Sequence, residues 1–385
     1  MKILIISKCP THPTNAGNRR FILNQIELLI RMGQDVHFLY IEENGFFHKD
    51  FCNKNSIQEM ESFFGKKFHL LSVGKFQKAV FNIRQRIRAF FSHGYMKCDD
   101  YYPIALTSYV RKLNKSEKFD VCIINYYYLS KLYLDCEIPR KAITTHDYFA
   151  YKDQLVNVKN VVNNTTAHEE AVALQRCNHI FALNTDEATY FSKLAPRNTV
   201  YNVFSTYAIS LQPLVCKHDL LFLSGNNVYN VKGLNWFIQE IFPAICRAIP
   251  DVKLLIAGSI CKKLDDLRKN PNVQLLGYVE NEADFYALGD VVINPTYLGT
   301  GLKIKTFESL SYGKITMAHP HSIQGVFESK NVPVFVSTKA NEWVAFLNQI
   351  WENPQKMLDI SKRSLNYISQ MNQYVEKEYI RFLEA

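Results

Sequence analysis

Residues 295–314, PTYLGTGLKIKTFESLSYGK, bring together residue types that could bind a phosphate: Gly299, Gly301, Lys303, Lys305 and Glu308. The two glycines permit a tight turn and a close approach of the backbone to a ligand. If a helix begins near residue 304, its free N–H groups and the two lysines attract an anion. The glutamate lies one turn further on and could accept hydrogen bonds from ribose hydroxyls. The segment therefore favours a nucleoside diphosphate, although an ordinary strand-to-helix turn with solvated lysines has the same spacing.

A second turn of this kind lies in residues 224–237, SGNNVYNVKGLNWF, and contains Gly225, Asn226, Lys232 and Gly233. The first glycine is expected to end a strand, and the lysine and the second glycine are expected to open the next helix. A glycine, a polar loop and a lysine at the start of a helix again favour an anion. In the first half of the chain, Gly17 also precedes a predicted helix and could face an anion. For each turn, the alternative is a plain connection with an exposed side chain.

Two predicted strands in the first half end in polar residues that could take part in chemistry. Asn125 ends the strand FDVCIIN, and His146 and Asp147 close TTHDYF. A histidine titrates near neutral pH, and a neighbouring carboxylate can act as a base or orient the imidazole. These three residues are therefore the candidate catalytic residues. The alternative is a histidine whose ring nitrogens bind backbone groups of a loop.

Short apolar strands alternate with helical segments along the chain. Strands are predicted at residues 2–7, 35–41, 119–125, 141–147, 179–184, 198–204, 220–225, 252–258, 273–279 and 291–294, and helices at 19–33 and about 234–248. This alternation predicts parallel α/β sheets, and a length of 385 residues predicts two domains. A linker is expected near residues 211–219. In such sheets ligands bind at the carboxyl ends of the strands, where the candidate residues lie.

The net charge of +9 is unevenly distributed, because the eight Lys and Arg residues from Lys66 to Lys97 occur there without a single acidic residue. Within this region, the segment from Lys75 to Phe91 has an apolar stripe at helical spacing and basic residues off the stripe. A basic amphipathic helix can lie on an anionic membrane surface, although a core-facing helix with a solvated basic face has the same pattern. No recognisable RNA-binding module accompanies the charge, so a nucleic-acid partner is not expected.

Several classes of protein are disfavoured by what the sequence lacks. The nine cysteines are scattered and never spaced CxxC, which favours reduced thiols in a cytosolic protein over a disulfide framework or a zinc site. No Asp-x-Asp follows an apolar strand and no His/Cys cluster has metal-ligand spacing, so no bound metal is expected. The N-terminus does not fit a signal peptide, and no apolar run reaches the length of a membrane span.

The second half of the chain resembles the GT-B-fold retaining glycosyltransferases of the family 4-like, group 1 type, which build bacterial surface glycans. That family carries G-R-x5-K-G after the first strand of its second domain, and GNNVYNVKG keeps Gly225, Lys232 and Gly233 but has Asn226 in place of the arginine. The family also carries two glutamates separated by seven residues. Glu308 matches the second, which is similar to the residue that holds the donor ribose, and Thr300 occupies the first position. We hypothesise that Lys303 and Lys305 supply the missing positive charge.

The first half matches the same family at fewer positions. Gly17 matches a glycine of the first strand-to-helix loop, and His146–Asp147 matches an HD pair that follows a later strand. Asn125 stands where many members have a functional histidine. The resemblance therefore implies that His146 or Asp147 orients the transferred sugar. The donor-binding residues that it implies are Gly17, Gly225, Asn226, Lys232, Gly301, Lys303, Lys305 and Glu308.

The resemblance implies an α/β protein of two Rossmann-like domains that face a central cleft, at residues 1–212 and 213–372, with a C-terminal helix at 373–385 returning to the first domain. It implies transfer of a sugar, with retained configuration, from a nucleotide diphosphate sugar to a glycan or lipid-linked glycan in polysaccharide, lipopolysaccharide or capsule synthesis. No cofactor or metal is expected, because lysines and helix N-termini would meet the charge on the leaving diphosphate. The expected location is the cytoplasm or the inner face of the cytoplasmic membrane.

Two other functions fit the same residues. A nucleotide-sugar epimerase of the same fold would use similar donor contacts and need no acceptor. A catalytically inactive glycan-binding or partner subunit would account for the missing glutamate, arginine and histidine.

Overall fold

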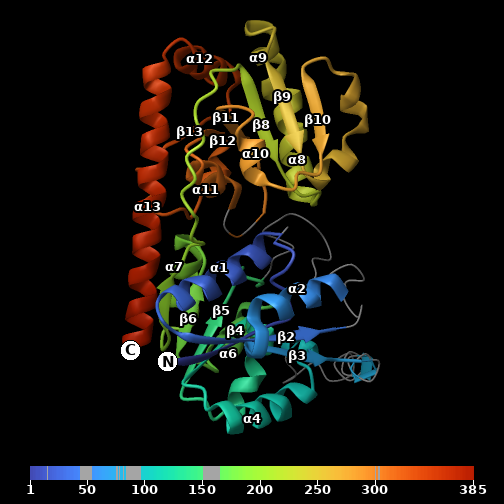
Figure 1. The fold of residues 1–385 in the computed structure, drawn as a ribbon, viewed down its shortest axis with the longest axis vertical. Coiled ribbons are helices and arrows are strands. Elements are labelled where there is room, and N and C mark those ends of the chain that lie inside the picture. Colours follow the sequence, from blue (N-terminus) through green and yellow to red (C-terminus); the bar gives the residue numbers. More distant parts are fainter. Residues whose placement is uncertain are drawn as a thin grey trace. The chain divides into compact units, whose positions relative to one another are not determined.

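The computed structural model describes residues 1–14, 16–43, 54–74, 77, 79–80, 82–83, 97–150, 165–299, 301 and 304–385. The chain forms two compact units, residues 1–205 with 375–385 (unit 1) and residues 206–374 (unit 2). Each unit is a parallel sheet with flanking helices, so the predicted α/β class is confirmed (Figure 1). Most of the segment from Lys75 to Phe91 lies outside the described residues, as do Thr300 and Lys303.

Unit 1 contains a seven-stranded sheet in the order β3-β2-β1-β4-β5-β6-β7. The strands are β1 (Lys2–Ser7), β2 (Asp35–Glu42), β3 (Phe68–Ser72), β4 (Val121–Asn125), β5 (Arg140–Thr144), β6 (His179–Ala182) and β7 (Thr199–Asn202). Every neighbouring pair is parallel. Strands β1 and β4 are buried on both faces, which explains their near-continuous apolar sequences. The strand order reverses between β1 and β4, and polar residues at their carboxyl ends lie at a switch point where ligands bind in such sheets.

The helical segments of unit 1 that the structure describes are α1 (Gly17–Arg31), α2 (Lys54–Phe64), η1 (Gly65–Lys67), η2 (Lys97–Tyr101), α4 (Ala105–Glu117), η3 (Tyr127–Leu134), α6 (Ala167–Leu174) and α7 (Thr185–Leu194). Helix α13 (Pro354–Glu384) begins in unit 2, and its residues from Val375 onward belong to unit 1. Tyr379 and Phe382 of that helix pack against the ring of Phe181, and Gln25 Nε2 donates a hydrogen bond to Tyr379 Oη at 2.9 Å. These contacts bury the end of α13 in the core of unit 1.

Unit 2 contains a six-stranded parallel sheet in the order β10-β9-β8-β11-β12-β13. The strands are β8 (Asp219–Leu223), β9 (Lys253–Ala257), β10 (Val273–Gly277), β11 (Val291–Asn294), β12 (Ile315–Ala318) and β13 (Val334–Val336). Alternate residues of β8 belong to different core clusters, Leu220 and Phe222 to one and Leu221 to the other. Successive side chains of a strand point to opposite faces, so the sheet is buried on both sides. Because β8 pairs with β11, the segments after these two strands begin side by side.

The helical segments of unit 2 are α8 (Val228–Trp236), a π-helical turn η4 (Phe237–Ile241), α9 (Phe242–Ala248), η5 (Ser259–Lys263), η6 (Asp265–Lys269), α10 (Glu282–Tyr286), α11 (Ile304–Ser311), η7 (Pro320–Ile323) and α12 (Ala340–Trp351). The helix predicted at 234–248 ends at Ala248 as predicted but starts earlier, and a π-helical turn lies within it. Asn227 caps α8 and moves the start back to Val228. Pro243, in the first turn of α9, has no N–H to continue the hydrogen bonds of the preceding helix, and a π turn separates the two helices.

Candidate functional site

The two glycine-containing turns of unit 2 are brought together by one buried asparagine. Asn230 of α8 is 6% exposed, and its Nδ2 donates to the backbone oxygen of Gly225 at 3.0 Å. Lys305 of α11 donates from Nζ to Asn230 Oδ1 at 2.8 Å. The amide of Asn230 thus joins the turn after β8 to the first turn of α11. Asn230 is not among the residues predicted from the sequence, although it lies within the GNNVYNVKG segment.

Gly233 has a packing role that only the structure reveals. A Cβ at this position would lie 2.8 Å from Pro295 O and 2.9 Å from Thr296 Cα, so no other residue fits without a backbone shift. Helix α8 therefore contacts the exit of β11 directly. The expectation that Lys232 and Gly233 open the helix is wrong, because the Asn227 cap starts the helix one turn earlier.

Lys232, Gly225 and Asn226 are the more exposed members of the predicted donor set. Lys232 lies in the middle of α8 with an exposed side chain. Asn226 is also exposed, and its backbone N–H donates to Ser259 Oγ at 3.2 Å. Gly225 has space for a Cβ, whose nearest neighbour would be Ser259 Oγ at 3.9 Å. Packing therefore does not require a glycine at position 225.

The turn before α11 depends on glycine. Gly299 has φ of +102° and Gly301 has φ of +79°, and side-chain-bearing residues rarely adopt such angles. A Cβ at Gly299 would also meet the ring of Tyr229 at 3.4 Å. His321 Nε2 donates to Gly299 O at 2.8 Å and fixes the turn from the η7 side. The two glycines therefore form the tight turn that the sequence predicts.

Helix α11 begins at Ile304, as the spacing of the segment predicts. Lys305 is half-buried, and Glu308 is 8% exposed one turn along the same face. The helix is held at its other face by Thr306, whose Oγ1 accepts from Asn294 Nδ2 at 2.8 Å and donates to Ser322 O at 3.2 Å. The start of α11, which follows β11 in the chain, thus carries a half-buried lysine and a buried carboxylate. Such a helix end favours an anion.

In unit 1, Asn125 and His146 are in direct contact. Their strands β4 and β5 are neighbours in the sheet, with Asn125 opposite Thr144. His146 Nε2 donates to Asn125 Oδ1 at 2.7 Å, which leaves Nδ1 as the acceptor of the imidazole. Burial lowers the pKa of His146 far below its usual value, so the ring is neutral near pH 7. Asn125 is fully buried, and its Nδ2 has no hydrogen-bond partner among the described residues.

Tyr126 holds the imidazole of His146 in place. Their rings stack with centroids 4.3 Å apart and an interplanar angle of 19°, and Phe21 contacts the imidazole edge-on at 5.3 Å. Asn18, next to Gly17 in the first turn of α1, donates from Nδ2 to Tyr126 Oη at 3.2 Å. Tyr126 and His146 have φ of +72° and +62°, conformations that cost about 1–3 kcal/mol each and concentrate at functional sites.

Asp147 lies half-buried beside a carboxylate that the sequence analysis missed. Glu170 of α6 is fully buried and accepts from the backbone N–H of Phe149 at 2.8 Å and from Tyr190 Oη at 2.9 Å. Burial raises the pKa of Glu170 to about 7, and the charge of Asp147 acts in the same direction. Glu170 thereby anchors the loop that follows His146. Its sequence signal is weak, because a glutamate in the first turn of a helix is ordinary.

The described part of the chain shows neither a candidate metal site nor a candidate membrane span. Within it, no group of three or more His, Cys, Asp or Glu side chains is arranged to hold a metal ion. None of the described helices is both long and apolar enough to cross a membrane.

Parts or all of the chain are similar to known proteins. Residues 217–353 match the family described as Glycosyl transferases group 1. An uncharacterized 44.6 kDa protein in the cps region of Klebsiella pneumoniae is 22% identical over 96% of this chain and 96% of its own. The structure is similar to HepE of Anabaena in complex with UDP, with a TM-score of 0.67 and 14% identity over 99% and 100% of the two chains. It is also similar to a mutant of S. aureus TarM in complex with fondaparinux, alpha-GlcNAc-glycerol and UDP, with a TM-score of 0.68 and 11% identity over all of both chains.

The matched segment contains both glycine turns, Asn230, Lys305 and Glu308, and the structural matches cover both units. Residues 217–353 are thus similar to the group 1 glycosyl transferases, and the chain as a whole has the GT-B fold.

Proposed function

We propose that this protein transfers a sugar, with retention of configuration, from a nucleoside diphosphate sugar to a hydroxyl of a glycan or lipid-linked glycan. The observation that carries the proposal is the hydrogen bond between Lys305 and Asn230, which unites two turns at the carboxyl ends of adjacent strands within the group 1 domain. Glu308, buried one turn further along α11, completes a set of groups suited to a diphosphate and a ribose.

The donor is proposed to bind to unit 2 through its diphosphate and its ribose. The N–H groups at the start of α11, Lys305 and the neighbouring Lys303 would receive the diphosphate. Glu308 would accept hydrogen bonds from the ribose hydroxyls. Gly301 would allow the backbone to approach the phosphates, since its φ is +79°. The complexes of HepE with UDP and with UDP-glucose support a uridine nucleotide as the first donor to test.

Four further residues are proposed to complete the donor site. Gly225 and Asn226 lie at the exposed end of β8, where a small residue and an amide leave room for a ligand. Lys232 has an exposed ammonium on α8 and would add positive charge. In unit 1, Gly17 begins α1 after Ala16, which provides no side-chain cap, and the N–H of Gly17 is proposed to bind an anion. The N–H of Arg19 already donates to Asn18 Oδ1 at 3.0 Å.

The residues of unit 1 are proposed to orient the transferred sugar. His146 is neutral and held by Asn125 and Tyr126, so its Nδ1 is presented as an acceptor without a charge. Such an imidazole suits a hydrogen bond to a sugar hydroxyl. Asp147 follows it directly and would bind a second hydroxyl or take up a proton. Asn125 acts through His146 by fixing its tautomer.

Transfer is proposed to proceed without a metal ion, since Lys305, Lys303 and the N-terminus of α11 would stabilise the charge that develops on the leaving diphosphate. Turnover that is unchanged by EDTA and by added magnesium would support this. Loss of turnover in EDTA, restored by a divalent ion, would contradict it.

The acceptor is proposed to be a growing surface polysaccharide, such as a capsule. The support is the similarity to a protein in a cps region and to TarM, whose complex contains a GlcNAc-glycerol. The basic segment from Lys75 to Phe91 is proposed to bring the enzyme to the cytoplasmic membrane face, where a lipid-linked acceptor would lie. Equal binding to anionic and neutral vesicles at low salt would contradict that part.

The experiment that tests the proposal is nucleotide release from a panel of UDP-sugars, with and without lipid-linked oligosaccharide acceptors. The expected result is acceptor-dependent UDP release by the wild type and a large loss in Glu308→Gln and in Lys305→Ala. Isomerised donor without transfer would instead identify an epimerase. Binding of a UDP-sugar without hydrolysis, transfer or isomerisation would identify an inactive subunit.

A further inference from the structure

The turn that follows β11 is hydrogen-bonded from outside by η7, the four-residue helical turn that follows β12. His321 Nε2 donates to Gly299 O at 2.8 Å. Ser322 Oγ donates to Thr296 O at 2.7 Å, and Ser322 O accepts at 3.2 Å from Thr306 Oγ1 in the first turn of α11. The exit of β11, the glycine turn and the start of α11 are therefore all bonded to one short segment.

Segment η7 is held in place by contacts of its own. His319 Nδ1 accepts from the backbone N–H of His321 at 3.1 Å, and the backbone N–H of His319 donates to Asn294 O at 3.0 Å. The ring of His319 packs edge-on against Trp236 of α8, with centroids 5.0 Å apart and an interplanar angle of 87°. Ser322 is fully buried. A buried, hydrogen-bonded segment of this kind holds the groups bonded to it in one conformation.

The glycine turn needs such support, because its own residues do not fix its shape. Gly299 and Gly301 both have positive φ, and glycine has more backbone freedom than any other residue. A turn of this kind loses conformational entropy when a ligand binds, unless it is ordered beforehand. Two side chains contact Gly299: His321 binds its carbonyl, and the ring of Tyr229 would lie 3.4 Å from a Cβ at this position. The turn is thus ordered without a ligand.

We propose that His321 is a positioning residue for the nucleotide-sugar donor, which fixes the carbonyl of Gly299 and so preforms the turn that receives the diphosphate. The inference rests on the proposed function, which supplies the ligand. His321 acts through the backbone of Gly299 and not through a contact with the donor. Its hydrogen bond needs a proton on Nε2, which neutral imidazole can carry on that nitrogen.

Substitutions at His321 can separate the hydrogen bond from the rest of the side chain. The amide nitrogen of glutamine lies as many bonds from Cα as Nε2 of histidine does, so His321→Gln keeps a donor at the same reach. The amide nitrogen of asparagine reaches only as far as Nδ1, so His321→Asn keeps a polar side chain but loses the bond. His321→Ala removes both.

The first test needs no nucleotide. The protein is labelled with nitrogen-15 at its 15 glycines, and the backbone order parameters of Gly299 and Gly301 are measured by NMR relaxation. They should be about 0.85 in the wild type and in His321→Gln, as in rigid backbone, and below about 0.6 in His321→Ala and His321→Asn. Equal order parameters in all four proteins would overturn the inference.

The second test measures the affinity for UDP by calorimetry and the turnover of a UDP-sugar. His321→Ala and His321→Asn should bind UDP about five- to tenfold more weakly, as expected for one lost hydrogen bond, and His321→Gln should stay within about twofold of the wild type. Because the turn serves the bound donor and the transition state alike, KM should rise while kcat stays within about twofold. Unchanged UDP affinity in His321→Ala would show that the turn does not position the donor.

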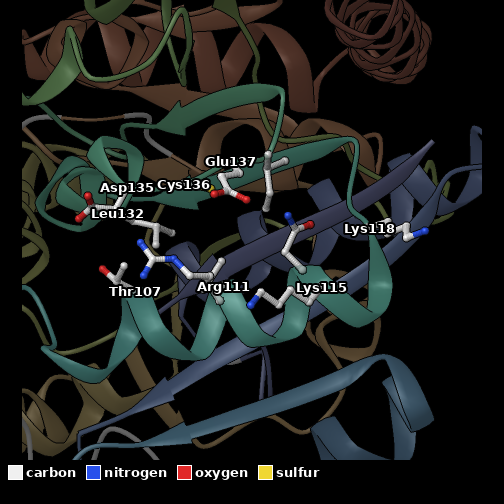
Figure 2. Close-up of a pocket in the computed structure, with 11 residues that line it drawn as sticks. Thr107, Arg111, Lys115, Lys118, Leu132, Asp135, Cys136 and Glu137 are labelled. Atoms are coloured by element: carbon white, nitrogen blue, oxygen red, sulfur yellow. The ribbon is translucent and has the colours of Figure 1, made fainter.

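Lys115→Ala is the control, because Lys115 is exposed on α4 and lines a surface pocket of unit 1 between α4 and the segment from Leu132 to Glu137 (Figure 2). It should match the wild type in both tests. A wild type that binds neither UDP nor any nucleotide sugar would contradict the proposed function, and the order parameters would still decide whether His321 preforms the turn.

Discussion

Lys305 Nζ donates to Asn230 Oδ1 at 2.8 Å, and this hydrogen bond links the first turn of helix α11 to helix α8. The two residues are 75 positions apart in the chain and lie in the helices that follow the adjacent strands β8 and β11. Asn230 also donates to Gly225 O, so the lysine is positioned by the same amide that shapes the first turn.

A double-mutant cycle on Lys305 and Asn230 should reveal strong coupling in donor binding. Lys305→Ala should weaken UDP-sugar affinity about tenfold or more, because one charge-assisted contact to the diphosphate is lost. Asn230→Ala should have an intermediate effect, and the double variant should be far less than additive, with a coupling of about 1 kcal/mol or more. Isothermal titration calorimetry gives the four affinities. Lys362→Ala, exposed on α13, is the control, and full additivity would show that the contact does not position the lysine.

Glu308→Gln should lose discrimination between ribose and deoxyribose. A carboxylate that accepts from a ribose hydroxyl makes the wild type prefer UDP to 2′-deoxy-UDP or 3′-deoxy-UDP by about tenfold or more. The variant should bind the three nucleotides within a few-fold of one another. Competition binding of the nucleotides measures this, and a variant with undiminished preference would remove Glu308 from the ribose site.

Gly233→Ala and Gly225→Ala form a matched pair for stability. The new Cβ would lie 2.8 Å from Pro295 O at position 233 and no closer than 3.9 Å to Ser259 Oγ at position 225. Overpacking should lower the free energy of unfolding of Gly233→Ala by about 1–3 kcal/mol, although alanine is the better helix former. Gly225→Ala should change it by less than about 0.5 kcal/mol. Urea unfolding measures the free energy of unfolding of each variant. A Gly233→Ala variant more stable than the wild type would contradict the close contact of α8 with the exit of β11.

The low pKa of His146 predicts that the protein loses stability in mild acid. The unfolded chain takes up a proton at this histidine below about pH 6.5, while the folded chain does not, so the free energy of unfolding falls as the pH falls. The slope from one such group is at most about 1.4 kcal/mol per pH unit. His146→Gln should remove this contribution, measured as the difference between the two pH profiles. Parallel profiles would show that the imidazole protonates normally, and His218→Gln controls for the loss of an exposed histidine.

The raised pKa of Glu170 predicts that stability depends on pH with the opposite sign. Its pKa in the folded protein is raised to about 7, so its stabilising contribution is present at low pH and is lost as the pH rises from about 4.5 to about 7. Glu170→Gln keeps an acceptor for the Phe149 N–H and should remove this loss. Thermal unfolding from pH 4.5 to 8 tests it, with the exposed Glu376→Gln as the control. A profile that is unchanged in Glu170→Gln would mean that the carboxylate is readily ionised.

Local sequence determined the parallel α/β class, most of the strands, the helix that begins near residue 304 and the candidate residues at the strand ends. Each of these follows from the spacing of apolar residues or from the backbone freedom of glycine, and both act over a few residues. The same local reasoning failed at α8, where the Asn227 cap outweighed the apolar pattern that begins at Leu234. It also omitted the short strands β3, β12 and β13.

Only the tertiary structure decided which of these residues meet. The order of the strands places β8 beside β11 and β4 beside β5, and this order sets Asn230 against Lys305 and Asn125 against His146. These partners lie 21 and 75 positions apart, beyond the reach of any local pattern. Sequence alone predicted the chemistry at each strand end, and packing selected the pairs because buried amides and imidazoles must find hydrogen-bond partners wherever the sheet brings them together.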